Sequence, residues 1–237
     1  MEESIALADQ AAVGASIDEK QRRRQALRYA NLFWLFLAGN VLGVLLEGVW
    51  SIGVLGHWET HVTMLWGPFN IVYGIGAVFM YIAAVLLEKK SPVINFLVLA
   101  AVGSTVEYLV AVFQERVFHS VSWDYSNHPF DLNGKISLPI TLMWGALGVL
   151  FAKLMLPVLK KVLPLLNRNW LNVACAVLSV LIALDMLASL ILLYRWGWYM
   201  TGHSQNAVLQ AIDRHCTDDF MAKRFVEWTR LLAAGFR

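Results

Sequence analysis

Charged residues are scarce in this chain. Only 15% of its 237 residues are Asp, Glu, Lys or Arg, whereas a soluble domain carries about 25%. Hydrophobic residues make up 58%, which excludes an ordinary soluble domain and predicts an integral membrane protein with the lipid bilayer as its main partner. The net charge of +2 is too small to indicate nucleic acid as a partner.

Cysteine and the usual signatures of cofactor and metal sites are also lacking. Cys175 and Cys216 cannot form a disulfide framework. The chain has no glycine-rich phosphate loop, so it does not itself hydrolyse nucleotide, and its cofactors stay unknown. His57, Glu59 and His61 are close in sequence, but in a zincin helix the Glu directly follows the first His. We therefore predict no metal site.

Long apolar runs are abundant. Five stretches reach the roughly 20 residues that a membrane-spanning helix needs, namely 29–55, 62–87, 92–118, 136–159 and 169–196. They predict an all-α, polytopic helical membrane protein with about five transmembrane helices. Gly67 and Pro68 predict a bend or break in the second span, because proline removes a helical donor.

Basic residues gather beside alternate ends of these stretches. Arg22 to Arg24, Lys89 with Lys90, and Lys160 with Lys161 fall on one side. The positive-inside rule then predicts a cytoplasmic N-terminus, in a bacterial inner membrane. The expected organisation is a polar cytoplasmic arm (1–25), a first two-helix repeat (26–90), a second with an outer loop (91–165), a fifth transmembrane helix (166–200) and an amphipathic C-terminal helix (201–237).

An acidic residue recurs in apolar surroundings. Gly43-x-x-x-Glu47 is repeated as Gly103-x-x-x-Glu107 in a stretch with the same direction, which predicts parallel repeats. At about 1.5 Å per residue, Glu47, Glu107 and Asp185 each lie roughly 21–23 Å into a hydrocarbon core about 30 Å thick. Buried ionisable residues normally face a bundle interior or water. We therefore expect one acidic chamber in the outer half of the membrane.

The residues expected at this chamber share that depth. The candidate ligand-binding residues are Glu47, Trp66, Asn70, Tyr73, Glu107, Thr141, Trp144, Asp185 and Arg195. The outer loop is expected to act as a lid or gate through Trp123, Asp124, Tyr125, Ser126 and Asn133. Asn133-Gly134 is a turn signal. A structural interpretation stays open, in which the carboxylates only join helices through hydrogen bonds.

Several of these motifs resemble one family. They are Gly43-x-x-x-Glu47, the run from Trp66 to Gly76, Gly103-x-x-x-Glu107, Trp123-Asp-Tyr-Ser126, Leu132-Asn-Gly-Lys-Ile136 and Asp185-x-x-x-Ser189. With these residues the chain resembles the putative ABC-transporter type IV permeases, also called CmpB-like. The resemblance implies a polytopic membrane protein with a role in transport.

Three functions remain open on this basis. The first is a small permease-like protein that binds a cation, a proton or a small polar ligand in the acidic chamber. The second is an intramembrane enzyme that uses a buried carboxylic acid on a lipid or isoprenoid. The third is a non-catalytic membrane partner or assembly factor, with homo-oligomers included. A non-enzymatic role is favoured, and catalytic residues stay unknown.

Overall fold

The computed structural model describes residues 1–59, 61–118, 122–200, 207 and 216–226. Its helices are α1 (Glu2–Ala26), α2 (Tyr29–Leu55), α3 (Ile71–Leu86), α4 (Pro92–Phe118), α5 (Leu138–Leu150), a π-helical turn η1 (Phe151–Met155), α6 (Leu156–Val162), a 3-10 turn η2 (Leu163–Leu166), α7 (Asn169–Met200) and α9 (Asp218–Arg224). The predicted all-α fold is confirmed. Most of the expected C-terminal helix at 201–237 lies outside the described residues.

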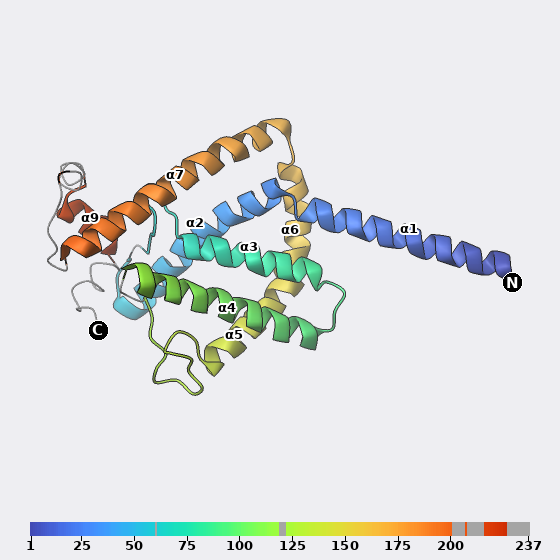
Figure 1. Cartoon of the computed structure of the whole chain (residues 1–237), viewed down its shortest axis with the longest axis horizontal. Coiled ribbons are helices and arrows are strands. Elements are labelled where there is room, and N and C mark those ends of the chain that lie inside the picture. Colours follow the sequence, from blue (N-terminus) through green and yellow to red (C-terminus); the bar gives the residue numbers. More distant parts are fainter. Residues whose placement is uncertain (60, 119–121, 201–206, 208–215, 227–237) are drawn as a thin grey trace.

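Four helical stretches are long and apolar enough to cross a membrane. They are Tyr29–Leu55, Pro92–Phe118, Leu138–Leu166 and Asn169–Gly197, and α3 is a shorter apolar helix of 16 residues. The chain is a polytopic helical membrane protein. In Figure 1, α2, α3 and α4 lie together, α7 runs along one side of them, and the path from α5 to α6 crosses behind.

The second predicted span is wrong at its start. Its helix begins at Ile71 instead of residue 62, because Gly67 has a left-handed φ of 70° and Pro68 follows it. Asn70 then caps α3 by accepting a hydrogen bond from the Val72 amide at 3.1 Å. The predicted break is therefore present, and residues 61–70 form a non-helical segment whose Val62 and Met64 are buried.

The fourth span runs further than expected, from α5 through α6 to η2. A proline occupies the first turn of α6, at Pro157. Its ring would clash with the carbonyl four residues earlier, at Lys153, and it has no amide to donate. Lys153 lies within the π-helical turn η1, where the wider winding accommodates this mismatch. The span thus continues through the proline instead of ending there.

The two ends of the bundle differ in chemistry. We call the end that carries Lys89, Lys90, Lys160 and Lys161 the basic end, and the opposite end, with residues 122–137, the loop end. From the basic end α1 extends away from the bundle as one continuous helix (Figure 1). The predicted polar arm is thus helical in the described structure.

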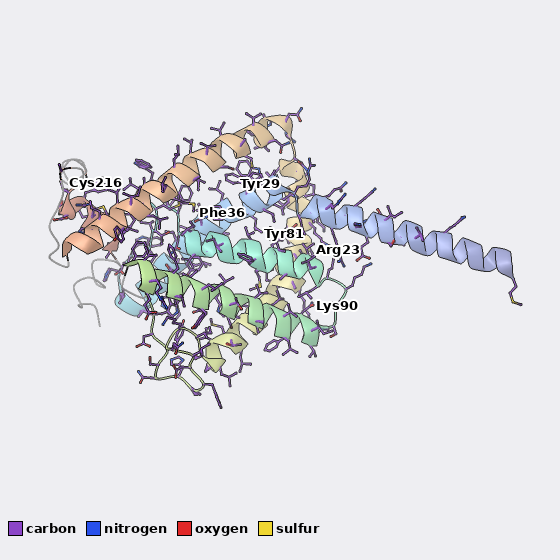
Figure 2. The ribbon with its side chains drawn as sticks, in the orientation of Figure 1. Arg23, Tyr29, Phe36, Tyr81, Lys90 and Cys216 are labelled. Atoms are coloured by element: carbon purple, nitrogen blue, oxygen red, sulfur yellow. The ribbon has the colours of Figure 1, made fainter. Side chains whose placement is uncertain are left out.

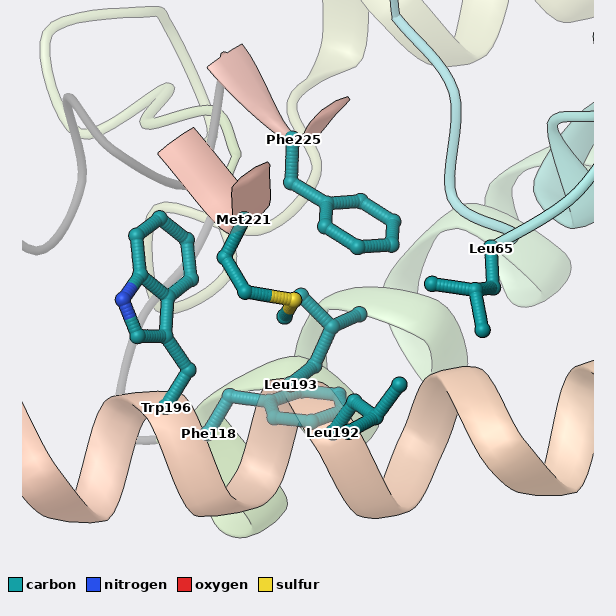
Figure 3. Packing of buried hydrophobic residues seen from close by; sticks show 7 residues of the cluster. All are labelled: Leu65, Phe118, Leu192, Leu193, Trp196, Met221 and Phe225. Carbon is teal, nitrogen blue, oxygen red and sulfur yellow. The ribbon is translucent and has the colours of Figure 1, made fainter. Parts of the chain in front are cut away.

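The loop end contains a compact apolar cluster. Met221 and Phe225 at α9 pack against α7 and the end of α4, as Figure 3 shows. The members of the cluster are Leu65, Phe118, Leu192, Leu193, Trp196, Met221 and Phe225. Because Met221 is fully buried, α9 packs on its own protein and fixes the non-helical segment against α7.

Candidate functional site: two glycine–aromatic–glutamate niches

Glu107 of α4 accepts hydrogen bonds from two aromatic side chains. Trp144 of α5 donates its Nε1–H to Oε2, and Tyr125 of the 122–137 loop donates its hydroxyl to Oε1 at 2.8 Å. The carboxylate therefore joins α4, α5 and the outer loop. Among the described residues, no Lys, Arg or His forms an ion pair with it.

Gly103 makes this arrangement possible. It lies one turn before Glu107 on the same helix face, where the Trp144 ring packs directly on the backbone. A Cβ atom added at Gly103 would lie only 2.6 Å from Trp144 Cγ. Any larger residue would push the indole away from Glu107. We call Gly103, Glu107 and Trp144 the second Glu niche.

The same arrangement occurs between α2 and α3. Tyr73 donates its hydroxyl to Glu47 Oε1 at 2.7 Å. A Cβ added at Gly43 would lie 2.2 Å from the Tyr73 ring. His61, from the non-helical segment, places Nδ1 3.5 Å from Glu47 Oε2. We call Gly43, Glu47 and Tyr73 the first Glu niche.

Further contacts recur with the same spacing. The two niches are separated by a constant offset, 60 residues from α2 to α4 (Glu47 to Glu107) and 71 residues from α3 to α5 (Tyr73 to Trp144). Accordingly Phe36 packs on Gly74 as Phe96 packs on Gly145. Gly39 likewise packs against Ala77, as Leu99 packs against Gly148. The two hairpins therefore share their packing as well as the Gly-x-x-x-Glu pattern.

The outer loop is built around Gly134. Asn133 and Gly134 both have left-handed φ angles, 54° and 67°, as the Asn-Gly turn signal predicts. A bridge between Leu132 and Ile136 closes this turn. The Tyr125 amide donates to the Gly134 carbonyl at 2.7 Å, and a Cβ at Gly134 would meet Asp124.

Further bonds hold the loop in shape. Trp123 donates its Nε1–H to the Lys135 carbonyl, and Asn133 donates to the Tyr108 hydroxyl. Asp124 accepts from both the hydroxyl and the amide of Ser126, and these bonds lower the pKa of Asp124. Burial and the bond to Glu107 raise the pKa of Tyr125, so the phenol keeps its proton at neutral pH. The loop thus presents a neutral donor to Glu107 from a fixed scaffold.

Asp185 of α7 has a different set of partners. Its carboxylate accepts from the backbone amides of Leu65 and Trp66 at 3.1–3.3 Å and from the Ser189 hydroxyl at 3.1 Å. Non-helical backbone at membrane depth is tolerated only where protein or water satisfies its polar groups. Asp185 satisfies two such amides, so its contacts support a structural role.

The other expected ligand residues are dispersed. Thr141 shares a hydrogen bond with Ser104 at 3.0 Å, and Asn70 donates to the His61 carbonyl at 2.9 Å. The Trp66 side chain is 62% exposed, and only its amide meets Asp185. Arg195 is buried and donates to the Cys216 carbonyl at 3.3 Å. The described contacts thus divide the expected chamber residues among several local groups.

Two residues of this end were not among the predicted site residues, although Ser189 stands in one of the quoted motifs. Arg224 of α9 donates to the Met64 carbonyl at 2.7 Å and to the Gly67 carbonyl, which satisfies the other side of the non-helical segment. Ser189 donates one bond to Asp185 and accepts another from the Leu65 amide. The Asp185-x-x-x-Ser189 spacing places both on one helix face and was a usable signal. Nothing local marks Arg224, because its partners lie about 160 positions away.

The described residues contain no group of three or more His, Cys, Asp or Glu side chains arranged to hold a metal ion. His61 lies between two carboxylates, with Nε2 3.8 Å from Glu59 Oε1 in addition to the Glu47 contact. What the niches offer chemically is a carboxylate within the bundle that can take up a proton or a small cation.

One family model matches this chain. It is described as "Putative ABC-transporter type IV" and covers residues 34–190. The chain belongs to this family. The matched part includes both Glu niches, the outer loop and Asp185, whereas α1 and α9 of this ABC-transporter type IV protein lie outside it. No curated protein and no solved structure matches the chain.

Proposed function

We propose that this ABC-transporter type IV protein is a small permease-like protein that binds a proton or a small cation at its Glu niches. The observation that carries the proposal is Glu107, a carboxylate inside the bundle with two neutral donors and no described cationic partner. An ionised carboxylate at such depth is costly. A proton or a cation lowers that cost, so Glu107 is the principal ion site.

Ion binding at Glu107 changes its link to the outer loop. Hydrogen bonds to an ionised carboxylate are roughly twice as strong as neutral ones. Protonation of Glu107, or coordination of a cation by Oε1, weakens or displaces the bond from Tyr125. The part of the loop around Tyr125 then loosens from α4, while Asn133 and Lys135 keep their contacts with that helix. Ion occupancy and opening of the loop end are coupled in this way.

We place the protein in a bacterial inner membrane with α1 on the cytoplasmic side. The positive-inside rule supports this orientation, because Lys89, Lys90, Lys160 and Lys161 all lie at the basic end. Both Glu niches then face the outer half of the membrane. Ions would enter beneath the outer loop.

An enzymatic role on a lipid is less well supported by the geometry. An apolar cleft of about 830 Å³ lies between α3, α4 and α7, with room for an acyl or isoprenoid chain. Among its described lining residues, however, there is no Asp or Glu. A chain in this cleft would not meet Glu47, Glu107 or Asp185, so the acid that the reaction needs is absent there.

The test is ion uptake in proteoliposomes. Glu107→Gln keeps the shape of the side chain and an acceptor for Tyr125, but it cannot be protonated or bind a cation as strongly. We expect loss of proton or sodium flux, measured with an internal pH dye or a sodium-sensitive dye. The control is Asp219→Asn, which removes an exposed carboxylate of α9 that pairs with Lys223 of the same helix.

Tyr125→Phe supplies a second test, since it leaves Glu107 intact and removes only the hydrogen bond from the loop to its carboxylate. It should keep ion binding and change the rate of flux. The proposal would be refuted if Glu107→Gln, shown to be folded by circular dichroism, had the same proton flux and the same sodium flux as the wild-type protein.

A further inference from the structure

A second cleft, with polar and charged lining residues, lies at the basic end, away from the Glu niches. It has a volume of about 830 Å³ and is bounded by the last turns of α1, by the end of α3 and by α6 with η2. Figure 2 labels Arg23 of α1 and Tyr81 of α3, which lie where α1 joins the bundle. Neither the acidic residues of the niches nor the outer loop contributes to it.

The cleft combines an apolar floor with a charged rim. Val85, Leu163 and Pro164 contribute the apolar surface. The rim has five cationic side chains, Arg22, Arg23, Arg28, Lys89 and Lys160, against three carboxylates, Asp18, Glu19 and Glu88. The rim is therefore net positive, and it lies beside a membrane-spanning bundle.

The three carboxylates cannot neutralise all five cations. Glu19 is shared, since both Arg23 and Lys89 donate to it, while Lys160 pairs with Glu88. The Arg28 guanidinium is exposed and forms no ion pair or hydrogen bond with any other described residue. Positive charge is thus left over for a ligand.

The backbone carbonyls that would repel an anion here already have donors. Asn31 donates to the Gln25 and Ala26 carbonyls at 2.9 and 3.2 Å, and the Tyr81 hydroxyl donates to the Ala26 carbonyl at 3.3 Å. These bonds satisfy two of the last carbonyls of α1, at the end of the helix whose partial charge is negative. The cationic side chains then dominate the potential in the cleft.

We propose that this cleft binds the phosphate group of an anionic phospholipid. The phosphate lies on the basic rim, where Arg28, Lys89 and Lys160 neutralise it, and the glycerol with the first acyl carbons lies on the apolar floor. A free phosphate ion would use the rim alone, so the floor favours the lipid. Because Arg22 and Arg23 belong to α1, the bound lipid also holds this helix against the bundle.

The experiment is a lipid titration of the full-length protein in detergent, followed by native mass spectrometry. Phosphatidylglycerol is the anionic probe and phosphatidylcholine the zwitterionic comparison. Arg28→Gln removes a cation of the cleft whose side chain bonds no other described residue, so we expect the variant to fold like the wild-type protein. Its control, Arg24→Gln, removes an exposed Arg of α1 that does not line the cleft.

We expect phosphatidylglycerol to bind more tightly than phosphatidylcholine. Arg28→Gln should weaken phosphatidylglycerol binding about fivefold, and Arg28→Gln with Lys160→Gln on the order of 25-fold. Arg24→Gln should leave the affinity unchanged. An equal loss in the Arg24 control would overturn the proposal, since it indicates general surface electrostatics. Equal binding of both lipids would also overturn it, since the net charge of the lipid would then play no part.

Competition separates the two sources of phosphate. Inorganic phosphate and glycerol phosphate, titrated against bound phosphatidylglycerol, should displace it only weakly, because neither fills the apolar floor. Displacement by inorganic phosphate with the affinity of the lipid itself would overturn the assignment to a phospholipid.

Discussion

Gly103→Ala tests whether the second Glu niche depends on the missing side chain. The added Cβ would lie 2.6–2.8 Å from three atoms of Trp144, closer than real Cβ contacts allow. Forcing extra volume into a packed site costs about 1–3 kcal/mol. Moving the indole also removes its bond to Glu107, and a hydrogen bond to a charged group contributes about 1.5–3 kcal/mol.

One contribution to this change in the free energy of unfolding is stabilising. Alanine favours a helix over glycine by about 1 kcal/mol. We therefore expect Gly103→Ala to lower the free energy of unfolding by about 1.5–5 kcal/mol in total. The measurement is chemical unfolding in detergent micelles, followed by circular dichroism. Gly76→Ala in α3 is the matched control, since nothing lies within 4 Å of its added Cβ.

The control should be neutral or more stable than wild-type protein. Adding Trp144→Ala should relieve the clash, giving the two substitutions a favourable coupling of about 1–3 kcal/mol. If Gly103→Ala proved as stable as Gly76→Ala, the close packing of Trp144 on Gly103 would be refuted.

Two further predictions concern the loop end. Asp185→Ala removes the carboxylate acceptor of the Trp66 amide and leaves the Leu65 amide with the Ser189 hydroxyl alone, at about 1–3 kcal/mol for the donor left unsatisfied. Hydrogen exchange at 61–70 should accelerate, with Asp219→Ala, an exposed α9 variant, unchanged there. The outer loop should be most ordered at neutral pH, because a carboxyl whose pKa is lowered by folding stabilises the fold above its unfolded pKa and loses that contribution as pH falls through the folded value. For Asp124, held by Ser126, exchange at 122–137 should rise below about pH 4; the same rise in Asp124→Asn would contradict this assignment.

Local sequence patterns account for much of this fold. Apolar runs place α2 and α4 at the predicted residues, and Gly67 with Pro68 marks the break before α3. Both signals are local, because each depends on side-chain hydrophobicity or on φ at one position. The same holds for the turn at Asn133 and Gly134.

Contacts between distant residues were not accessible in this way. The Gly-x-x-x-Glu pattern located Glu107, but no pattern indicates that Tyr125 and Trp144 share its two oxygens. Counting residues by depth put Asp185 at a level close to Glu107. It did not reveal that the partners of Asp185 are backbone amides 119 and 120 positions away. Such pairings depend on how helices pack, and depth alone does not contain that information.

The two niches have the same glycine–aromatic packing, but a different residue from outside the helices contacts the glutamate in each. His61 approaches Glu47, whereas Tyr125 donates to Glu107. An imidazole can accept a proton and become a cation, whereas the Tyr125 phenol is a neutral donor. The group that closes the first niche can therefore carry positive charge, and His61 also faces Glu59.

On the proposed function, this difference gives the two niches different roles. An ion at Glu107 would meet the neutral partners Tyr125 and Trp144, so its binding would depend on the carboxylate. An ion arriving at Glu47 competes with a proton on His61, because a protonated imidazole already neutralises that carboxylate. On the proposed function, His61→Gln should thus reduce the pH dependence of sodium flux and leave the flux itself. Loss of flux in His61→Gln, with pH dependence retained in the remainder, would assign the ion site to the first niche instead.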